Sequence, residues 1–306
     1  MSIEIVITQM MIIFVLMAAG LIFMRKKIVD ASGVKQISAL VSNICNPALL
    51  LTSAFSEDNT ATNEQVLLVA AIAFFVFTLM LLLGKFVGTL LGAPKDQRNY
   101  YCLMTMFGNI GFIGIPLATA ILGAGCLIYI AVFNFMFFIY IYTYGIYLLE
   151  KQGGLKGKIN PRVFLNPGTV SAALTVLIFF LKLPVPTIAA ESLTYMGNAT
   201  VFLAIFVIGT SLAQVSFREI IKEYRLYLFI ILRYIAVPVL TALIMKMITD
   251  DMIILGTTVI MMAVPAGNMP LMLAKERDLE ADILSKGIIL STVLSLVTIP
   301  IVTLFV

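Results

Sequence analysis

The chain has 306 residues, of which 61% are hydrophobic and 12% are charged, with a formal net charge of +4. Soluble domains are about 45–50% apolar and about 25% charged, so this composition excludes a soluble globular protein. The chain holds no histidine, which excludes histidine-based catalysis and histidine metal sites. We predict an all-α integral membrane protein that is not an enzyme and binds no nucleic acid. The cysteines, Cys45, Cys102 and Cys126, lie in apolar runs and are predicted to be core residues.

Ten apolar segments each approach the length of about 20 residues with which a helix crosses a bilayer. They run over 3–23, 36–54, 66–91, 98–121, 126–148, 163–181, 192–213, 225–247, 252–273 and 283–304. The first segment lacks a basic start and a small-residue cleavage site. We therefore expect it to stay in the protein as a spanning helix.

Basic residues concentrate in every second loop. The loops after the odd-numbered spans hold Arg25, Lys26, Lys27, Lys35, Lys95, Arg98, Lys151, Lys156, Lys158, Arg162, Arg218, Lys222, Arg225, Lys275 and Arg277. The other loops contribute only Lys182 and Lys246. Because cytoplasmic loops are enriched in Lys and Arg, the basic loops are predicted to be cytoplasmic. An even number of spans then places both termini outside the cell (inner) membrane.

The longest basic loop, 151–162, divides the chain into two halves of five spans each. Residues 1–150 form the first half and residues 163–306 the second. An odd number of spans per half gives the halves opposite orientations, which is the arrangement of inverted-repeat transporters. We predict two inverted repeats joined by a cytoplasmic linker.

The fourth and ninth spans each carry helix breakers where a spanning helix should be regular. These residues are Asn109, Gly111, Gly114 and Pro116 in span 4, and Pro265, Gly267, Asn268 and Pro270 in span 9. Aligning "IPLATAI" with "MPLMLAK" pairs Pro116 with Pro270. Matching interruptions in the two halves predict a transporter's binding site, because unwound backbone at membrane depth has to face a cavity or protein. The alternative is that Gly and Pro mark only kinks and close packing.

The expected ligand of such a site is an anion. Proline lacks an N–H group and glycine tolerates unusual backbone angles, so both favour local unwinding. The new helix that starts after a break presents free N–H groups and partial positive charge. These groups favour an anion, and Asn109 and Asn268 would add amide donors.

Three stretches resemble the auxin efflux carrier family, which includes the plant PIN-FORMED carriers and many bacterial organic-anion permeases. They are "GNIGFIGIPL" (108–117), "LFIILRYIAVPVL" (228–240) and "AVPAGNMPLMLAKE" (263–276). The short middle loop is similar to that of bacterial members. The resemblance implies a fold like that of the bile-acid sodium symporters, with a scaffold domain (helices 1, 2, 6, 7) and a transport domain (helices 3–5, 8–10). Broken helices 4 and 9 would cross at the substrate site. It also implies elevator-type alternating access and a homodimer joined through the scaffold helices.

The resemblance further implies a small organic anion as substrate, a mono- or dicarboxylate such as malate or malonate. In plant members the asparagine that matches Asn109 contacts the substrate carboxylate. Asn268 stands where those members often have an apolar residue, which favours a more polar anion than auxin. No cofactor or metal site is expected, and coupling to Na⁺ or H⁺ stays open. Sodium would bind unwound carbonyls and amides. A proton relay would need carboxylates, and the centres of the spans contain none.

Three further polar residues lie inside spans. Arg233 in span 8 attracts the anion, clamps a mobile helix or snorkels to the cytoplasmic face. Asn46 in span 2 lines the scaffold side of the cavity or holds a neighbouring helix. Asn134 in span 5 contacts the substrate or forms an interhelical hydrogen bond.

Other functions make different demands on the sequence. A carrier of aromatic carboxylates such as indole acids would use the same site. An anion channel predicts a continuous polar stripe, whereas the polar residues here gather at mid-depth. An intramembrane enzyme would need a catalytic pair that the spans lack. A sensor built on a carrier fold would be expected to carry a signalling domain.

Overall fold

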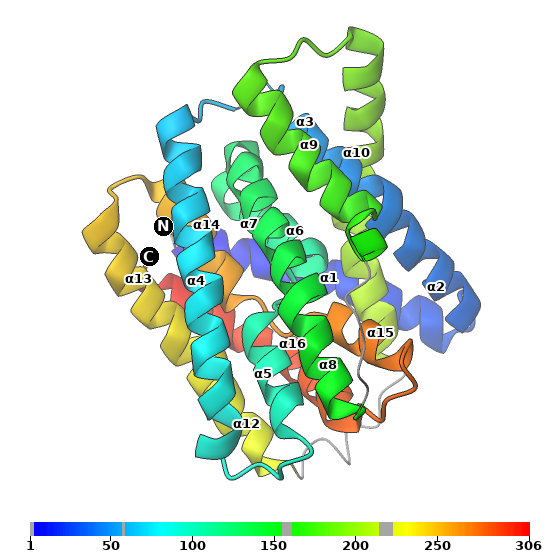
Figure 1. Ribbon diagram of the computed structural model, residues 1–306. Coiled ribbons are helices and arrows are strands. Elements are labelled where there is room, and N and C mark those ends of the chain that lie inside the picture. Colours follow the sequence, from blue (N-terminus) through cyan, green and yellow to red (C-terminus); the bar gives the residue numbers. More distant parts are fainter. Residues whose placement is uncertain (1–2, 57–58, 155–160, 214–222) are drawn as a thin grey trace.

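The computed structural model describes residues 3–56, 59–154, 161–213 and 223–306. Within these ranges the regular structure is helical, with one isolated β-bridge, so the predicted all-α class is confirmed. Helices of the two halves of the chain interleave (Figure 1): α1 and α3 pack on α10, and α7 packs on α9. Residues 155–160 of the predicted linker lie outside the described residues, as do Arg218 and Lys222.

In the first half of the chain, the described residues form helical elements, several of which are shorter than the predicted spans. They are α1 (Ile3–Arg25), α2 (Ala31–Leu40), η1 (Val41–Cys45), α3 (Asn46–Thr52), α4 (Asn63–Leu90), α5 (Arg98–Met106), η2 (Ile110–Gly114), α6 (Ile115–Leu122), η3 (Ala124–Cys126), α7 (Leu127–Tyr140), η4 (Ile141–Gly145) and α8 (Ile146–Gln152). Predicted span 2 corresponds to α2, η1 and α3 in succession. Predicted span 4 is broken between α5 and η2.

The second half follows the same pattern. Its elements are η5 (Pro161–Phe164), α9 (Pro167–Leu181), α10 (Thr187–Leu212), α12 (Tyr224–Ile231), η6 (Leu232–Ala236), α13 (Val237–Ile248), α14 (Met252–Ala263), α15 (Met269–Lys275) and α16 (Asp282–Thr303). Predicted span 9 is broken between α14 and α15. Thus each half contains a helix that is interrupted where the sequence placed its breakers.

Six helical stretches of the described residues are long and apolar enough to cross a membrane. They are 6–25, 63–90, 124–152, 187–212, 224–248 and 282–303. Three further apolar helices, 110–122, 167–181 and 252–263, are shorter. Two of these shorter helices adjoin the breaks, because the interruption divides a span into parts that are each too short to cross alone.

In the part of the chain that the structure describes, four five-residue segments are π-helical: η1, η2, η4 and η6. Three of these segments end two residues before a proline, at Pro47, Pro116 and Pro238. Proline cannot donate to the carbonyl four residues back, and its ring collides with that carbonyl. The wider turn relieves the collision: the N–H group of Ile115, for example, donates to Ile110 five residues back. Such bulges are frequent at functional sites in helices.

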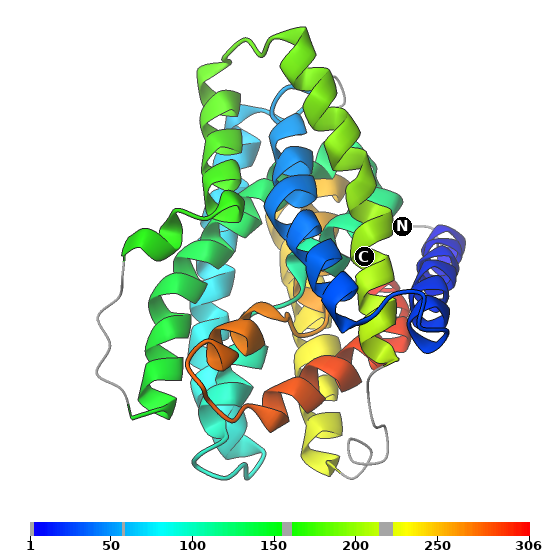
Figure 2. The ribbon, with the colours of Figure 1, turned by 90° about the vertical axis from the view of Figure 1, so that its right-hand side faces the viewer.

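Helices α1 and α10 approach each other at glycines. A Cβ atom added to Gly209 would lie 1.9 Å from the carbonyl oxygen of Met17, and one added to Gly20 would lie 2.1 Å from that of Phe206. Figure 2 shows α1 lying against α10 at one side of the molecule. Small residues allow this close packing between helices in a bilayer.

The centre of the molecule is formed by α5, α7 and α14. Residues 100–106, 127–134 and 254–263 are buried throughout. All three cysteines are buried free thiols, as expected for core residues. Because α5 and α14 lead directly into the two breaks, the interrupted segments lie inside the protein rather than against lipid.

Candidate functional site: two broken helices that cross

The two interrupted helices meet at their breaks. Helix α5 ends at Met106 and the chain becomes helical again at Ile110, whereas α14 ends at Ala263 and α15 begins at Met269. The two unwound segments run antiparallel and form the isolated β-bridge. Sequence analysis predicted both interruptions, and the structure brings them together.

Two backbone hydrogen bonds join the breaks. The N–H group of Asn109 donates to the carbonyl oxygen of Pro265 at 2.7 Å, and that of Gly267 donates to Phe107 at 2.8 Å. Unpaired backbone groups are costly away from water. Each unwound segment therefore supplies hydrogen-bond partners for backbone groups of the other. The crossing is therefore a built element of the fold and not two independent kinks.

The crossing requires glycine at two positions. A Cβ atom at Gly267 would lie 2.8 Å from the carbonyl oxygen of Gly108. A Cβ atom at Gly108 would lie 2.8 Å from a methyl carbon of Val264. Both distances are shorter than ordinary van der Waals contact, so any larger residue would push the two segments apart.

Arg233 binds the carbonyl groups that the breaks release. In continuous helices, Thr105 would accept from Asn109, and Met262 would accept from Ala266. Here the Arg233 Nε donates to the Thr105 oxygen at 2.6 Å and Nη1 donates to the Met262 oxygen at 2.7 Å. One guanidinium thus bridges the C-terminal ends of α5 and α14, where the helix dipoles favour a positive charge.

Burial decides between the alternatives for Arg233. The residue is 1% exposed, which rules out snorkelling to the membrane surface. Its Nη2 atom is buried without a hydrogen-bond partner among the described residues. The next residue, Tyr234, donates its hydroxyl to the Met104 oxygen at 3.0 Å, another carbonyl in the last turn of α5. The bonds of Arg233 are those of a clamp on both interrupted helices.

Ser291 on α16 supports the crossing from a third side. Its hydroxyl oxygen accepts a hydrogen bond from the Ala266 N–H group at 3.1 Å and donates to Ile288 at 3.0 Å. The residue is 2% exposed. Sequence analysis missed both Ser291 and Tyr234. The only signal for Tyr234 was its place beside Arg233, and Ser291 looks like any other hydroxyl residue of its span.

The two predicted asparagines differ in their bonding. Asn109 is buried and caps the helical segment that follows it, because its Oδ1 accepts from the Phe112 N–H group at 3.2 Å. Asn268 is half-buried, directly precedes α15 and makes no capping bond with its side chain. Its amide therefore remains available at the crossing.

Asn46 reaches the crossing from span 2. A Cβ atom added to Gly111 would lie 3.0 Å from the Asn46 Nδ2. The Asn46 Oδ1 is buried and has no hydrogen-bond partner in the described part of the chain. Gly114 faces the other break, with its added Cβ 3.5 Å from a Val264 methyl carbon. Asn46, Gly111 and Gly114 thus lie near one another at the crossing.

The remaining predicted residues make no described hydrogen bond between the two broken helices. Pro116 and Pro270 both lie in the first turn of a helix, α6 and α15, and both are buried. The Nδ2 of Asn134 donates to Ile130 at 3.1 Å, so its described bond stays within its own helix. A substrate contact by Asn134 therefore stays a prediction.

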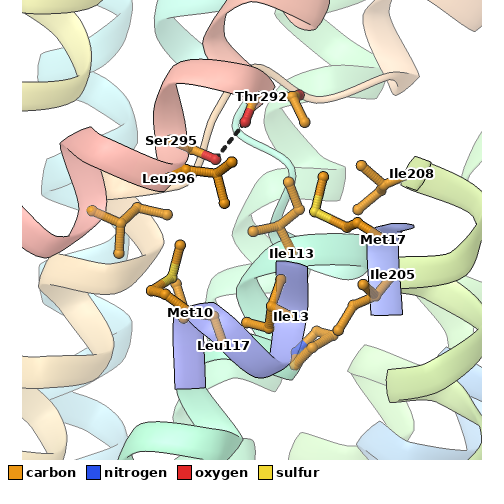
Figure 3. Close-up of a pocket in the computed structure, with 12 residues that line it drawn as sticks. Met10, Ile13, Met17, Ile113, Leu117, Ile205, Ile208, Thr292, Ser295 and Leu296 are labelled. Atoms are coloured by element: carbon orange, nitrogen blue, oxygen red, sulfur yellow. Dashed lines mark hydrogen bonds between the residues drawn. The ribbon is translucent and has the colours of Figure 1, made fainter. Parts of the chain in front are cut away.

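An apolar pocket adjoins the crossing (Figure 3). It lies between α1, α6, α10 and α16 and is lined by residues such as Met10, Ile113, Pro116 and Ile205. The hydroxyls of its two polar residues, on α16, donate to carbonyls of their own helix. The pocket is apolar, unlike the crossing beside it.

No cluster of three or more His, Cys, Asp or Glu residues that could hold a metal ion occurs within the four described ranges. The groups described at the crossing are backbone groups, side-chain amides, the hydroxyls of Ser291 and Tyr234, and the guanidinium of Arg233. These groups can bind a ligand by hydrogen bonds and charge. Such an arrangement can hold an anion.

Comparison with known proteins decides the family. The family described as "Membrane transport protein" matches residues 5–303. The chain belongs to this family, the auxin efflux carrier family. Its members are transport proteins and not enzymes, and the chain is a multi-pass membrane protein. An "Uncharacterized transporter" of Methanothermobacter thermautotrophicus is 24% identical over 288 residues, which cover 94% of each chain.

Proposed function

We propose that the chain is a secondary carrier of small organic anions, mono- or dicarboxylates such as malate or malonate, and that the anion binds at the crossing of the fourth and ninth helices. The observation that carries this proposal is the pair of hydrogen bonds between the two breaks, Asn109 to Pro265 and Gly267 to Phe107. In a transport protein, unwound backbone in the buried centre supplies polar groups that can bind a substrate. The helix that starts after Asn109 directs its N–H groups toward this point.

The proposed architecture has ten spans in two inverted repeats, with both termini outside the plasma membrane. Helices 1, 2, 6 and 7 form a scaffold and pair in a homodimer, while helices 3–5 and 8–10 carry the substrate in an elevator movement. Three features support this division: the breaks fall in the same place of each half, the glycines of α1 and α10 lock helices 1 and 7 together, and Asn46 meets the crossing from helix 2.

One observation favours a second candidate, an aromatic carboxylate related to indole acids. The apolar pocket is lined in part by Pro116, at the start of α6, so an apolar group attached to a carboxylate would meet apolar side chains there; the pocket, at about 20 Å³, would have to widen to hold a ring. A dicarboxylate would leave that pocket unused. Competition between malonate and indole-3-acetate for uptake distinguishes the two.

The proposal is tested by uptake of a panel of labelled carboxylates into liposomes that contain the purified chain. The Asn109→Ala/Asn268→Ala variant should lose uptake. Asn43→Ala is the matched control, since this asparagine is exposed and its amide donates to Ala39 on its own helix at 2.9 Å. Equal uptake by wild type and double variant would place the site elsewhere.

A single substitution separates the two roles of Asn109. Asn109→Ser keeps an oxygen that can cap the next helix but lacks the amide donor. If the amide donor binds the anion, the variant folds normally and its KM for the carboxylate rises. If Asn109 acts only as a cap, the variant transports like the wild type.

A further inference from the structure

We infer that Arg233 is the fixed counter-cation of the crossing, and that anion binding there requires no sodium ion. This inference rests on the proposed function for the identity of the anion site. It does not depend on which carboxylate is carried. It concerns the ion that balances the charge of the substrate inside the membrane.

An anion in the buried centre of the protein needs a nearby positive charge. Burying an unpaired charge is costly, so a carrier either binds a cation with its substrate or supplies one from its own side chains. In transporters with broken helices, coupled cations bind to unwound carbonyls and to the C-terminal ends of half-helices. The ends of α5 and α14 are the places where such an ion would bind.

Three of those carbonyls already accept hydrogen bonds from buried side chains. Arg233 donates hydrogen bonds to the carbonyl oxygens of Thr105 and Met262, one in each interrupted helix, at 2.6 Å and 2.7 Å. The Tyr234 hydroxyl donates a hydrogen bond to the carbonyl oxygen of Met104 at 3.0 Å. A sodium ion that used the oxygen of Thr105 or Met262 would therefore have to displace a buried guanidinium.

The sequence offers a sodium ion no carboxylate in compensation. Residues 98–122, 224–248 and 252–275, which include both interrupted helices and the helix that carries Arg233, contain no Asp or Glu. A cation at the crossing would therefore depend on neutral oxygens alone, beside a fixed positive charge that repels it. The guanidinium and an inorganic cation are alternatives at this place.

The first experiment needs no substrate and no variant. Thermal unfolding of the purified full chain in detergent is compared in NaCl and in choline chloride at equal ionic strength. A ligand that binds the folded state raises the unfolding temperature in a saturable way. We expect no difference between the salts, and a saturable rise with NaCl would overturn the inference.

The second experiment measures uptake of labelled malonate and malate into liposomes. With NaCl replaced by choline chloride, the rate should not change, and a rate that requires sodium would refute the inference while leaving the carrier function intact. Absence of uptake in both salts would count against the proposed substrates. The thermal comparison would still decide the role of sodium.

Substitution of Arg233 tests the charge itself. Arg233→Gln should reduce uptake by about tenfold or more, because two charge-assisted hydrogen bonds and the positive charge are lost. Arg233→Lys should restore part of it. Lys246→Gln is the matched control, since it removes an exposed positive charge from the same predicted span. If the Gln variant folds and transports like this control, Arg233 is not the counter-cation.

Discussion

Replacing Ser291 by alanine should loosen the crossing without touching either broken helix. The buried Ser291 hydroxyl accepts a hydrogen bond from the N–H group of Ala266 at 3.1 Å. Alanine leaves that N–H group without a partner, and a buried unsatisfied donor costs about 1–3 kcal/mol. A loss of this size corresponds to an equilibrium constant for local opening that is about 5- to 150-fold larger, since each 1.4 kcal/mol is a factor of about ten.

Ser295, one turn further along α16, is the matched control. It is also buried, at 5% exposure, but its hydroxyl donates only to Thr292 of its own helix at 2.7 Å. Ser295→Ala should therefore change stability little. The measurement is hydrogen exchange, read by mass spectrometry on peptides that contain residues 264–268. Equal exchange in the two variants would refute the reasoning that Ser291 holds the second break.

The glycine contacts lead to two more predictions. Gly209→Ala should separate α1 from α10 and destabilise the protein by about 1–3 kcal/mol, measured by thermal unfolding, because the new methyl group would lie 1.9 Å from the Met17 oxygen. An unchanged unfolding temperature would contradict this. Gly267→Ala should abolish transport, since its methyl group would lie 2.8 Å from the Gly108 oxygen, whereas Gly111→Ala meets only a side-chain amide nitrogen at 3.0 Å and should be milder. The reverse order of the two effects would show that the backbone approach is not what matters.

Much of the fold followed from hydropathy and from the positions of Gly and Pro. The predicted spans lie on observed helices, and both breaks fall within the segments that the sequence marked. These features are local, because hydropathy follows from the solvent around a helix and breakers act within one turn. The N-cap of α9 at Asn166 is local in the same way: its side chain accepts from the Thr169 N–H group at 3.0 Å.

The register of the crossing was less predictable. Pairing Pro116 with Pro270 relates residues that are 154 positions apart, whereas the β-bridge joins Gly108 to Ala266, which are 158 apart (266 − 108). The difference is about one helical turn. It arises because η2 is inserted between the first break and Pro116, whereas Pro270 follows the second break at once.

The partners of Arg233 could not be read from the sequence. Its two acceptors, Thr105 and Met262, are ordinary positions that become special only because the helices end near them. Which carbonyl loses its partner depends on the exact residue at which each helix stops, and helix ends are uncertain by one or two residues even in a known structure. Long-range bonds of this kind are set by the whole fold.

The crossing also constrains how the chain is made. The residues that it joins, Gly108 and Ala266, are 158 positions apart, and synthesis adds about 5–20 residues per second. The first interrupted helix thus waits about 8–30 seconds in the membrane before its partner exists. During that time the Asn109 N–H group and the Thr105 carbonyl oxygen lack the partners that later satisfy them, Pro265 and Arg233. Until the second half is made, the first half therefore carries unpaired backbone groups in the membrane that the finished fold satisfies.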